Sequence, residues 1–138
     1  MRSIRKQLLD IFAGDEPEYE RAAALGFAAL PVLAEMVNED IGVASSAVYV
    51  AGLIAAHESV DIIARAARSD DPDLRTHAAG ALRQFVSRTH SSDNLDAAAE
   101  ILAPLLDDQD VCVRKFAQRA AAAFPDGARH PVGRHASS

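Results

Sequence analysis

The side chains that could bind a metal ion are few and scattered along the sequence. His57 and Glu58 are adjacent where a loop or helix start is expected, and His77 falls on another expected helix. A protein metal site needs several ligands that meet in space. No second His-Glu pair occurs in the chain, and the other histidines fall in a connection or near the C-terminal end. The sequence therefore predicts no metal site and no cofactor.

Nucleophilic catalysis has equally little support. Cys112 is expected in the first turn of a helix, where a thiolate would be favoured. Its place beside the apolar Val113 is more typical of a small packed residue. The chain has no glycine-rich phosphate loop and no serine in a nucleophile elbow. We therefore predict a protein that is not an enzyme. The single cysteine excludes an intrachain disulfide and fits a reducing compartment.

Polar side chains with a regular spacing occur instead in two turns. Asp71 and Arg75 flank the start of one expected helix, and Asp110 and Arg114 flank the start of another. An aspartate at such a position can accept hydrogen bonds from the first N–H groups of the helix. An arginine four residues later can reach an acidic group in its own or an adjacent turn. We interpret these four residues as structural.

The rest of the chain predicts helices to position these turns. Hydrophobic residues make up 49% and aromatic residues only 5%, with alanine dominant, which favours helix over strand. Apolar spacing and capping residues predict helices at residues 3–13, 18–25, 27–37, 43–56, 59–68, 70–86, 96–106 and 111–124. Residues 87–94 read as one long polar connection. We expect a single all-α domain over residues 1–124 and a disordered tail over residues 125–138.

An internal repeat underlies this helical pattern. Residues 62–85 align with residues 101–124 without a gap, at an offset of 39 and with seven identities in 24 positions. The identical pairs are Ile62 and Ile101, Ala64 and Ala103, Asp71 and Asp110, Arg75 and Arg114, Ala78 and Ala117, Ala81 and Ala120, and Phe85 and Phe124. A third copy fits residues 32–54, with Ala44 in place of the arginine and a turn that lacks the matching aspartate. Such a period is typical of an α-solenoid.

Three segments carry a common pattern: AALGFAALPVLAEMVNED, SDDPDLRTHAAGALRQF and DDQDVCVRKFAQRAAAAF. Each has features of a helix with a proline, an aspartate-containing turn and an alanine-rich helix, and together they resemble the HEAT repeats, including short bacterial HEAT-like repeats. The resemblance implies a superhelix of about four stacked antiparallel helix pairs. Residues 1–26 would form a degenerate N-terminal capping unit, and residues 27–56, 58–86 and 94–124 would form the repeat units. The family shares an architecture but not a function.

A solenoid of helix pairs usually binds partners on the concave face made by the second helix of each pair. Three outward columns remain once the core positions are removed: Ser45, Thr76 and Lys115; Tyr49, Gly80 and Arg119; and Gly52, Arg83 and Ala122. Tyrosine and arginine are favoured at binding hot spots. We therefore predict partner-binding residues on this face, the alternative being an ordinary solvated surface. They are Tyr49, Thr76, Arg83, Lys115 and Arg119.

The charge of the chain narrows the class of partner. With 14 basic and 20 acidic residues the formal net charge is −6, whereas a nucleic-acid-binding domain normally shows a basic stripe. No apolar run approaches the roughly 20 residues that span a bilayer. We predict a cytoplasmic, non-catalytic interaction or scaffold module. It would bind another protein, favoured to carry a basic patch, through the concave face or the solenoid ends. The oligomeric state stays open.

The resemblance leaves an enzymatic or ligand-handling alternative: a HEAT-like lyase or a chromophore-handling chaperone. HEAT-type hydroxylases bind two irons through several His-Glu pairs, of which this chain has only His57-Glu58. A DNA-lesion glycosylase of similar fold would need a basic groove and aromatic side chains, which this sequence lacks.

Overall fold

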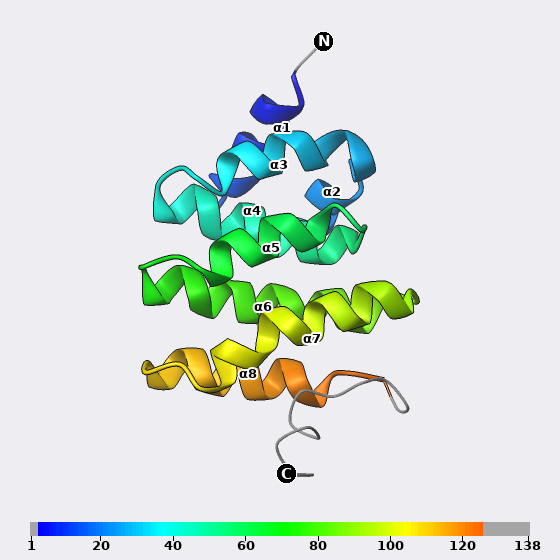
Figure 1. Cartoon of the computed structure of the whole chain (residues 1–138). Helices are drawn as coiled ribbons and strands as arrows, with labels where there is room; N and C mark the ends of the chain where they lie inside the picture. Colours follow the sequence, from blue (N-terminus) through cyan, green and yellow to red (C-terminus); the bar gives the residue numbers. More distant parts are fainter. Residues whose placement is uncertain (1–2, 126–138) are drawn as a thin grey trace, which may run out of the picture.

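The computed structural model describes residues 3–125, which form α-helices and one 3-10 helix and no strand (Figure 1). The elements are α1 (Ile4–Phe12), α2 (Tyr19–Ala23), the 3-10 helix η1 (Gly26–Ala29), α3 (Leu30–Met36), α4 (Ile41–Ile54), α5 (Ser59–Ala67), α6 (Pro72–Arg88), α7 (Ser92–Leu106) and α8 (Val111–Ala122). The predicted all-α class is confirmed. The predicted disordered tail lies outside the described residues, apart from Pro125. No helix in the described range is both long and apolar enough to cross a membrane.

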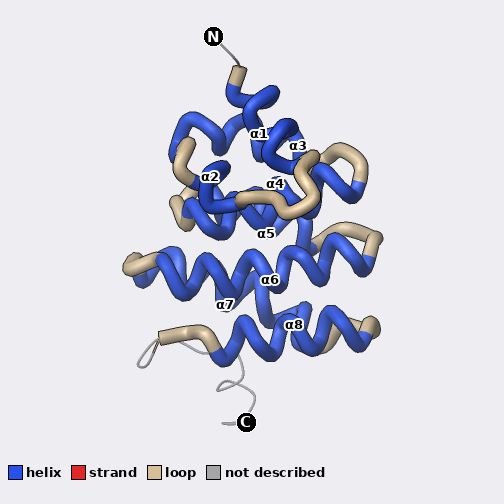
Figure 2. The backbone as a smooth tube through the Cα atoms, turned by 180° about the vertical axis from the view of Figure 1, so that it is seen from behind, coloured by secondary structure: helices blue, strands red, loops and turns tan. Residues whose placement is uncertain are grey.

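From α3 onward the helices lie in two layers. In one layer α4 packs against α6 and α6 against α8; in the other α5 lies between α3 and α7. Figure 1 shows α5 and α7 in front of α6 and α8, and Figure 2 shows the same stack from behind. The helices α1 and α2 lie at the N-terminal end, where α2 packs on α4. The chain thus alternates between the layers as it descends the stack.

Alanine lets neighbouring helices of one layer approach closely. Ala78 and Ala81 of α6 and Ala117 and Ala120 of α8 are fully buried, and larger side chains such as Phe85 fill the space beside them. A helix that presents alanine at its crossing points can come nearer to its neighbour while the interior stays close-packed. The alanine-rich composition therefore reflects helix packing as well as helix propensity.

The contact between α4 and α6 is tight at Gly52. A Cβ atom at this position would lie 2.5 Å from the carbonyl oxygen of Ala81 and 3.0 Å from its Cα atom. The repeat alignment predicts Gly52 in an outward column with Arg83 and Ala122, and this prediction is wrong for Gly52, which is buried. A glycine has no side chain from which the sequence could show the direction that the position faces.

The predicted long connection at residues 87–94 is also wrong. The helix α6 continues to Arg88 and α7 begins at Ser92, which leaves three residues between them. Ser91 accepts a hydrogen bond from the N–H of Asn94 at 3.2 Å, and the Asn94 side chain donates to the Thr89 hydroxyl at 3.1 Å. These polar residues cap a helix instead of forming a loop, and Thr89 and Asn94 are buried.

The N-terminal helices are shorter than predicted. The helix expected at residues 18–25 covers only Tyr19–Ala23, and the one expected at residues 27–37 is divided into η1 and α3. Gly26 has a φ of 66°, the left-handed conformation that glycine adopts without steric cost. Pro31 lies in the first turn of α3, where its missing N–H would have had no partner.

Candidate functional site

The turns before α6 and α8 have the same hydrogen-bond pattern. Asp71 accepts from the N–H of Asp73 at 2.9 Å, and Asp110 accepts from the N–H of Cys112 at 2.8 Å and of Val113 at 3.1 Å. Cys112 stands 39 residues after Asp73. The predicted capping role of Asp71 and Asp110 is therefore confirmed, with Asp110 satisfying one more N–H group.

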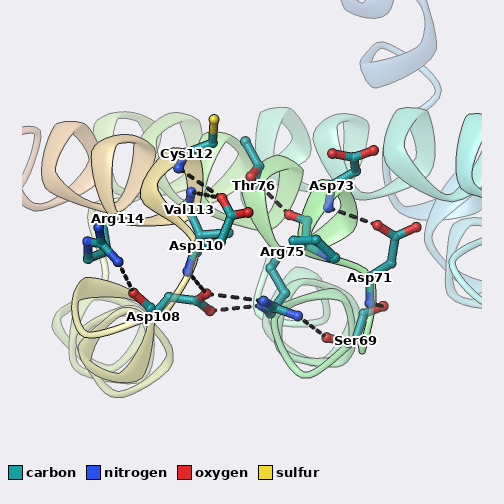
Figure 3. A network of polar contacts seen from close by, with 11 residues as sticks. Ser69, Asp71, Asp73, Arg75, Thr76, Asp108, Asp110, Cys112, Val113 and Arg114 are labelled. Atoms are coloured by element: carbon teal, nitrogen blue, oxygen red, sulfur yellow. Dashed lines mark hydrogen bonds and ion pairs between the residues drawn. The ribbon is translucent and has the colours of Figure 1, made fainter.

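Arg75 joins one turn to the next (Figure 3). Its Nη1 donates to the Ser69 carbonyl oxygen of its own turn at 3.0 Å. Its Nε and Nη2 donate to the two carboxylate oxygens of Asp108, in the following turn, at 2.8 Å and 3.1 Å. Bidentate pairing of this kind is among the stronger polar contacts in proteins. The side chains are only 16% and 10% exposed, so solvent screens the pair weakly.

The ion pair shifts the acidity of both groups. The hydrogen bond from Arg75 lowers the pKa of Asp108, burial opposes this shift, and the N–H of Asp110 assists it. The hydrogen bond to Asp108 raises the pKa of Arg75 above its usual value. Both groups therefore stay charged under ordinary conditions. The sequence predicts that Arg75 reaches an acidic group in its own or an adjacent turn; the structure selects the adjacent turn.

Arg114 repeats only the first half of this arrangement. Its Nη1 donates to the Asp108 carbonyl oxygen at 2.6 Å, as Arg75 donates to Ser69. Figure 3 shows Arg75 and Arg114 on opposite sides of Asp108. In the turn before α4, Asp40 occupies the N-cap position but makes no side-chain capping bond. The expectation that this turn lacks the matching aspartate is therefore wrong, because Asp40 stands there. Its side chain nevertheless makes no capping hydrogen bond.

Tyr49 lies in the hollow between α2 and α4. Its ring centroid is 5.3 Å from that of Tyr19, whose hydroxyl is 3.2 Å from the Ser46 hydroxyl. Pro17 and Leu53 line the same hollow. The repeat could not indicate Tyr19, which precedes the aligned region. Tyr49 and Arg119 belong to helices that are separated by α6 (Figure 2). The structure therefore associates Tyr49 with α2 and does not gather it with Arg119.

The other predicted partner-binding residues lie on α6 and α8. Thr76 is half-buried and donates its hydroxyl to the Pro72 carbonyl oxygen at 2.9 Å. Arg83, Lys115 and Arg119 are exposed. The Arg119 guanidinium lies 4.9 Å from the ring centroid of Phe116, a cation–π contact. We call Arg83, Lys115, Phe116 and Arg119 the α6–α8 face.

The sequence pattern missed Phe116 because it aligns with the polar His77. The side chain of Phe116 is 37% exposed, and Val111 at the start of α8 is 51% exposed. Exposure of large apolar groups beside arginine is typical of interaction surfaces. The face therefore offers both charge and apolar area to a partner.

Groups that could perform covalent or metal chemistry do not gather elsewhere in residues 3–125. No group of three or more His, Cys, Asp or Glu residues in that range has a metal-binding arrangement. The packed position favoured for Cys112 is wrong, because its side chain is exposed, while its backbone N–H donates to Asp110.

The fold is similar to that of an engineered protein known from its crystal structure. The two share 23% sequence identity with a TM-score of 0.57, over 88% of this chain and 56% of the engineered protein. This chain thus spans little more than half the length of that protein. At this level of identity the likeness shows the fold alone. No protein-family model and no curated protein matches the sequence.

Proposed function

We propose that this chain is a non-catalytic protein–protein interaction module, built as a HEAT-like solenoid of about four helix pairs. Two observations support the solenoid. The turns before α6 and α8 repeat the same hydrogen bonds at an offset of 39 residues. In addition, α4, α6 and α8 pack in succession as the second helices of consecutive pairs. Each pair buries its apolar side against the next.

The observation that carries the function is the α6–α8 face. Phe116 is exposed and in contact with Arg119, Lys115 is exposed on the same helix, and Arg83 is exposed on α6, which packs against α8. An aromatic ring and arginine together supply the side chains that most often dominate binding energy. Binding requires no movement of the stack, because these side chains already lie on the surface.

The experiment is capture of a host protein on the immobilised full-length chain. The triple substitution Arg83→Ala, Lys115→Ala and Arg119→Ala should abolish the capture that the original chain shows. The matched control, Arg65→Ala with Arg68→Ala, removes exposed cations from α5 and its C-cap in the other layer and should leave capture unchanged.

Two results would contradict the proposal. One is capture that the triple substitution leaves intact, which would contradict the α6–α8 face as the binding surface. The other is a stoichiometric chromophore or metal in the purified protein, seen by an absorbance scan and metal analysis. That result would favour the alternative of a HEAT-like lyase or ligand-handling chaperone.

A further inference from the structure

The helices of the two layers differ in charge. The helices α4, α6 and α8 carry six basic residues and one acidic residue, Asp73. The helices α3, α5 and α7 carry one basic and five acidic residues. Beyond the N-cap carboxylates Asp40, Asp71 and Asp110, the helices α4, α6 and α8 are therefore net positive in a chain whose formal net charge is −6. A partner responds to the local field of the surface it approaches, not to the total charge.

Three of the six cations in the α4–α6–α8 layer already have partners within the fold. Arg75 binds Asp108, Arg114 donates to the Asp108 carbonyl oxygen, and Arg88 binds Glu20 at 3.0 Å. The remaining three are Arg83, Lys115 and Arg119, which form no ion pair with the residues that the structure describes. These three are the cations of the α6–α8 face.

The apolar part of the face distinguishes classes of acidic partner. Phe116, in contact with Arg119, and Val111 are both exposed on α8, the helix that carries Lys115 and Arg119. A Cβ atom on Gly80 would meet nothing within 4 Å, which leaves open space on α6. Nucleic acid is held chiefly through many phosphate contacts. Three cations with exposed aliphatic and aromatic groups instead match a segment that alternates carboxylates with large apolar side chains.

We propose that the α6–α8 face binds an acidic, amphipathic protein segment. Its carboxylates pair with Arg83, Lys115 and Arg119, and its apolar side chains cover Phe116 and Val111. This inference rests on the proposed function and names its partner class. It replaces, for this face, the basic partner that the net charge favours.

The experiment is fluorescence anisotropy with the full-length chain and three labelled probes of equal charge. They are a peptide of glutamate and leucine, a peptide of glutamate and glycine, and a single-stranded DNA oligonucleotide. The glutamate–leucine peptide should bind most tightly. The triple substitution Arg83→Ala, Lys115→Ala and Arg119→Ala should weaken this binding about tenfold or more.

Two further variants separate the parts of the proposal. Phe116→Ala should weaken binding of the glutamate–leucine peptide more than that of the glutamate–glycine peptide, because only the first has apolar side chains to place on the ring. Arg65→Ala with Arg68→Ala should change neither. Circular dichroism should show that each variant remains folded, since the substituted side chains are all exposed.

Three outcomes would overturn the proposal. These are no binding of the glutamate–leucine peptide, binding that the triple substitution does not weaken, and DNA binding tighter than peptide binding. If host-protein capture persists and depends on the face while the acidic peptide does not bind, the interaction function stands and the acidic partner class is wrong. If both fail, the interaction function fails with it.

Discussion

Two junctions between neighbouring helices, α4 with α6 and α6 with α8, are stabilised by different physical means. Between α4 and α6 the backbones meet at Gly52, with Ala44 at the position that corresponds to Arg75. Between α6 and α8 the Arg75–Asp108 ion pair bridges the turns, and Arg83 stands where Gly52 stands one pair earlier. The first junction relies on close packing and the second on a directed polar contact.

The two junctions also differ in the side chains that they leave exposed. At the tight junction the glycine leaves no side chain to present to a partner. At the second junction the bridging arginine holds the turns together, while Arg83 is exposed and available for contact. The surface that we propose for binding therefore lies on α6 and α8, not on the N-terminal helices.

At the N-terminal end α1 joins the stack by a third arrangement. Arg5 donates to both carboxylate oxygens of Glu39 at 2.8 Å and 2.7 Å, and this pair lowers the pKa of Glu39. Both side chains are more exposed than those of Arg75 and Asp108, at 42% and 32%. The geometry is equally good, but solvent screens this pair more, so it stabilises the stack less.

The largest effect should come from filling the tight junction. Gly52→Ala should lower the free energy of unfolding by about 3 kcal/mol, because its Cβ atom would overlap the Ala81 carbonyl group and force the helices apart. Gly80→Ala is the matched control on the next helix. It meets open space and should raise stability by up to about 1 kcal/mol through helix propensity. Urea unfolding measures both, and equal stability of the two variants would contradict the packing argument.

Substitutions at the polar junction between α6 and α8 should have the next largest effect on stability. Arg75→Met should cost about 2 kcal/mol, because it leaves the poorly exposed Asp108 carboxylate without its cation. Arg114→Met removes a single bond to a carbonyl oxygen and should cost about 1 kcal/mol. A double-mutant cycle of Arg75→Met with Asp108→Asn should give a coupling energy well above zero. If the losses of stability in the two single variants simply add in the double variant, the ion pair contributes little to the free energy of unfolding.

The stability that each N-cap aspartate contributes should follow the number of N–H groups from which it accepts a hydrogen bond. Asp110 accepts two, Asp71 accepts one and Asp40 accepts none. Replacement by alanine should therefore cost about 1.5 kcal/mol, about 1 kcal/mol and close to nothing in that order. Thermal unfolding of the three variants tests the series, and an Asp40→Ala variant as unstable as Asp110→Ala would break it.

The smallest effect should be on the pH dependence of the free energy of unfolding. Because the folded-state pKa of Asp108 is lowered, its contribution to stability is present above about pH 4 and is lost as pH falls through the lowered value. The free energy of unfolding should therefore fall less steeply with acidification in Asp108→Asn than in the original chain. In an Arg75→Met background the same substitution should change the slope less. Urea titrations between about pH 5 and pH 2 would show both differences.

The sequence by itself determined the helical class and the chemistry of the turns. Alanine content and apolar spacing are local properties, and an aspartate cap acts on N–H groups two or three residues away. Asp71, Asp110 and the reach of Arg75 could therefore be predicted from the repeat. The same local reasoning misread residues 87–94, because the polar residues of a cap and of a loop are alike until their partners are known.

Only the tertiary structure decided which surface faces outward and what charge it carries. Gly52 and Arg83 occupy equivalent positions, yet one is buried and the other exposed, because the distance between neighbouring helices depends on contacts remote in sequence. The alignment did not indicate Phe116, because this residue aligns with the polar His77. The positive charge of α6 and α8 could not be recognised from the formal net charge, which sums over all helices and turns. Burial and local charge are collective properties of packed helices, so the face that we propose for binding could be recognised only when the helices were in place.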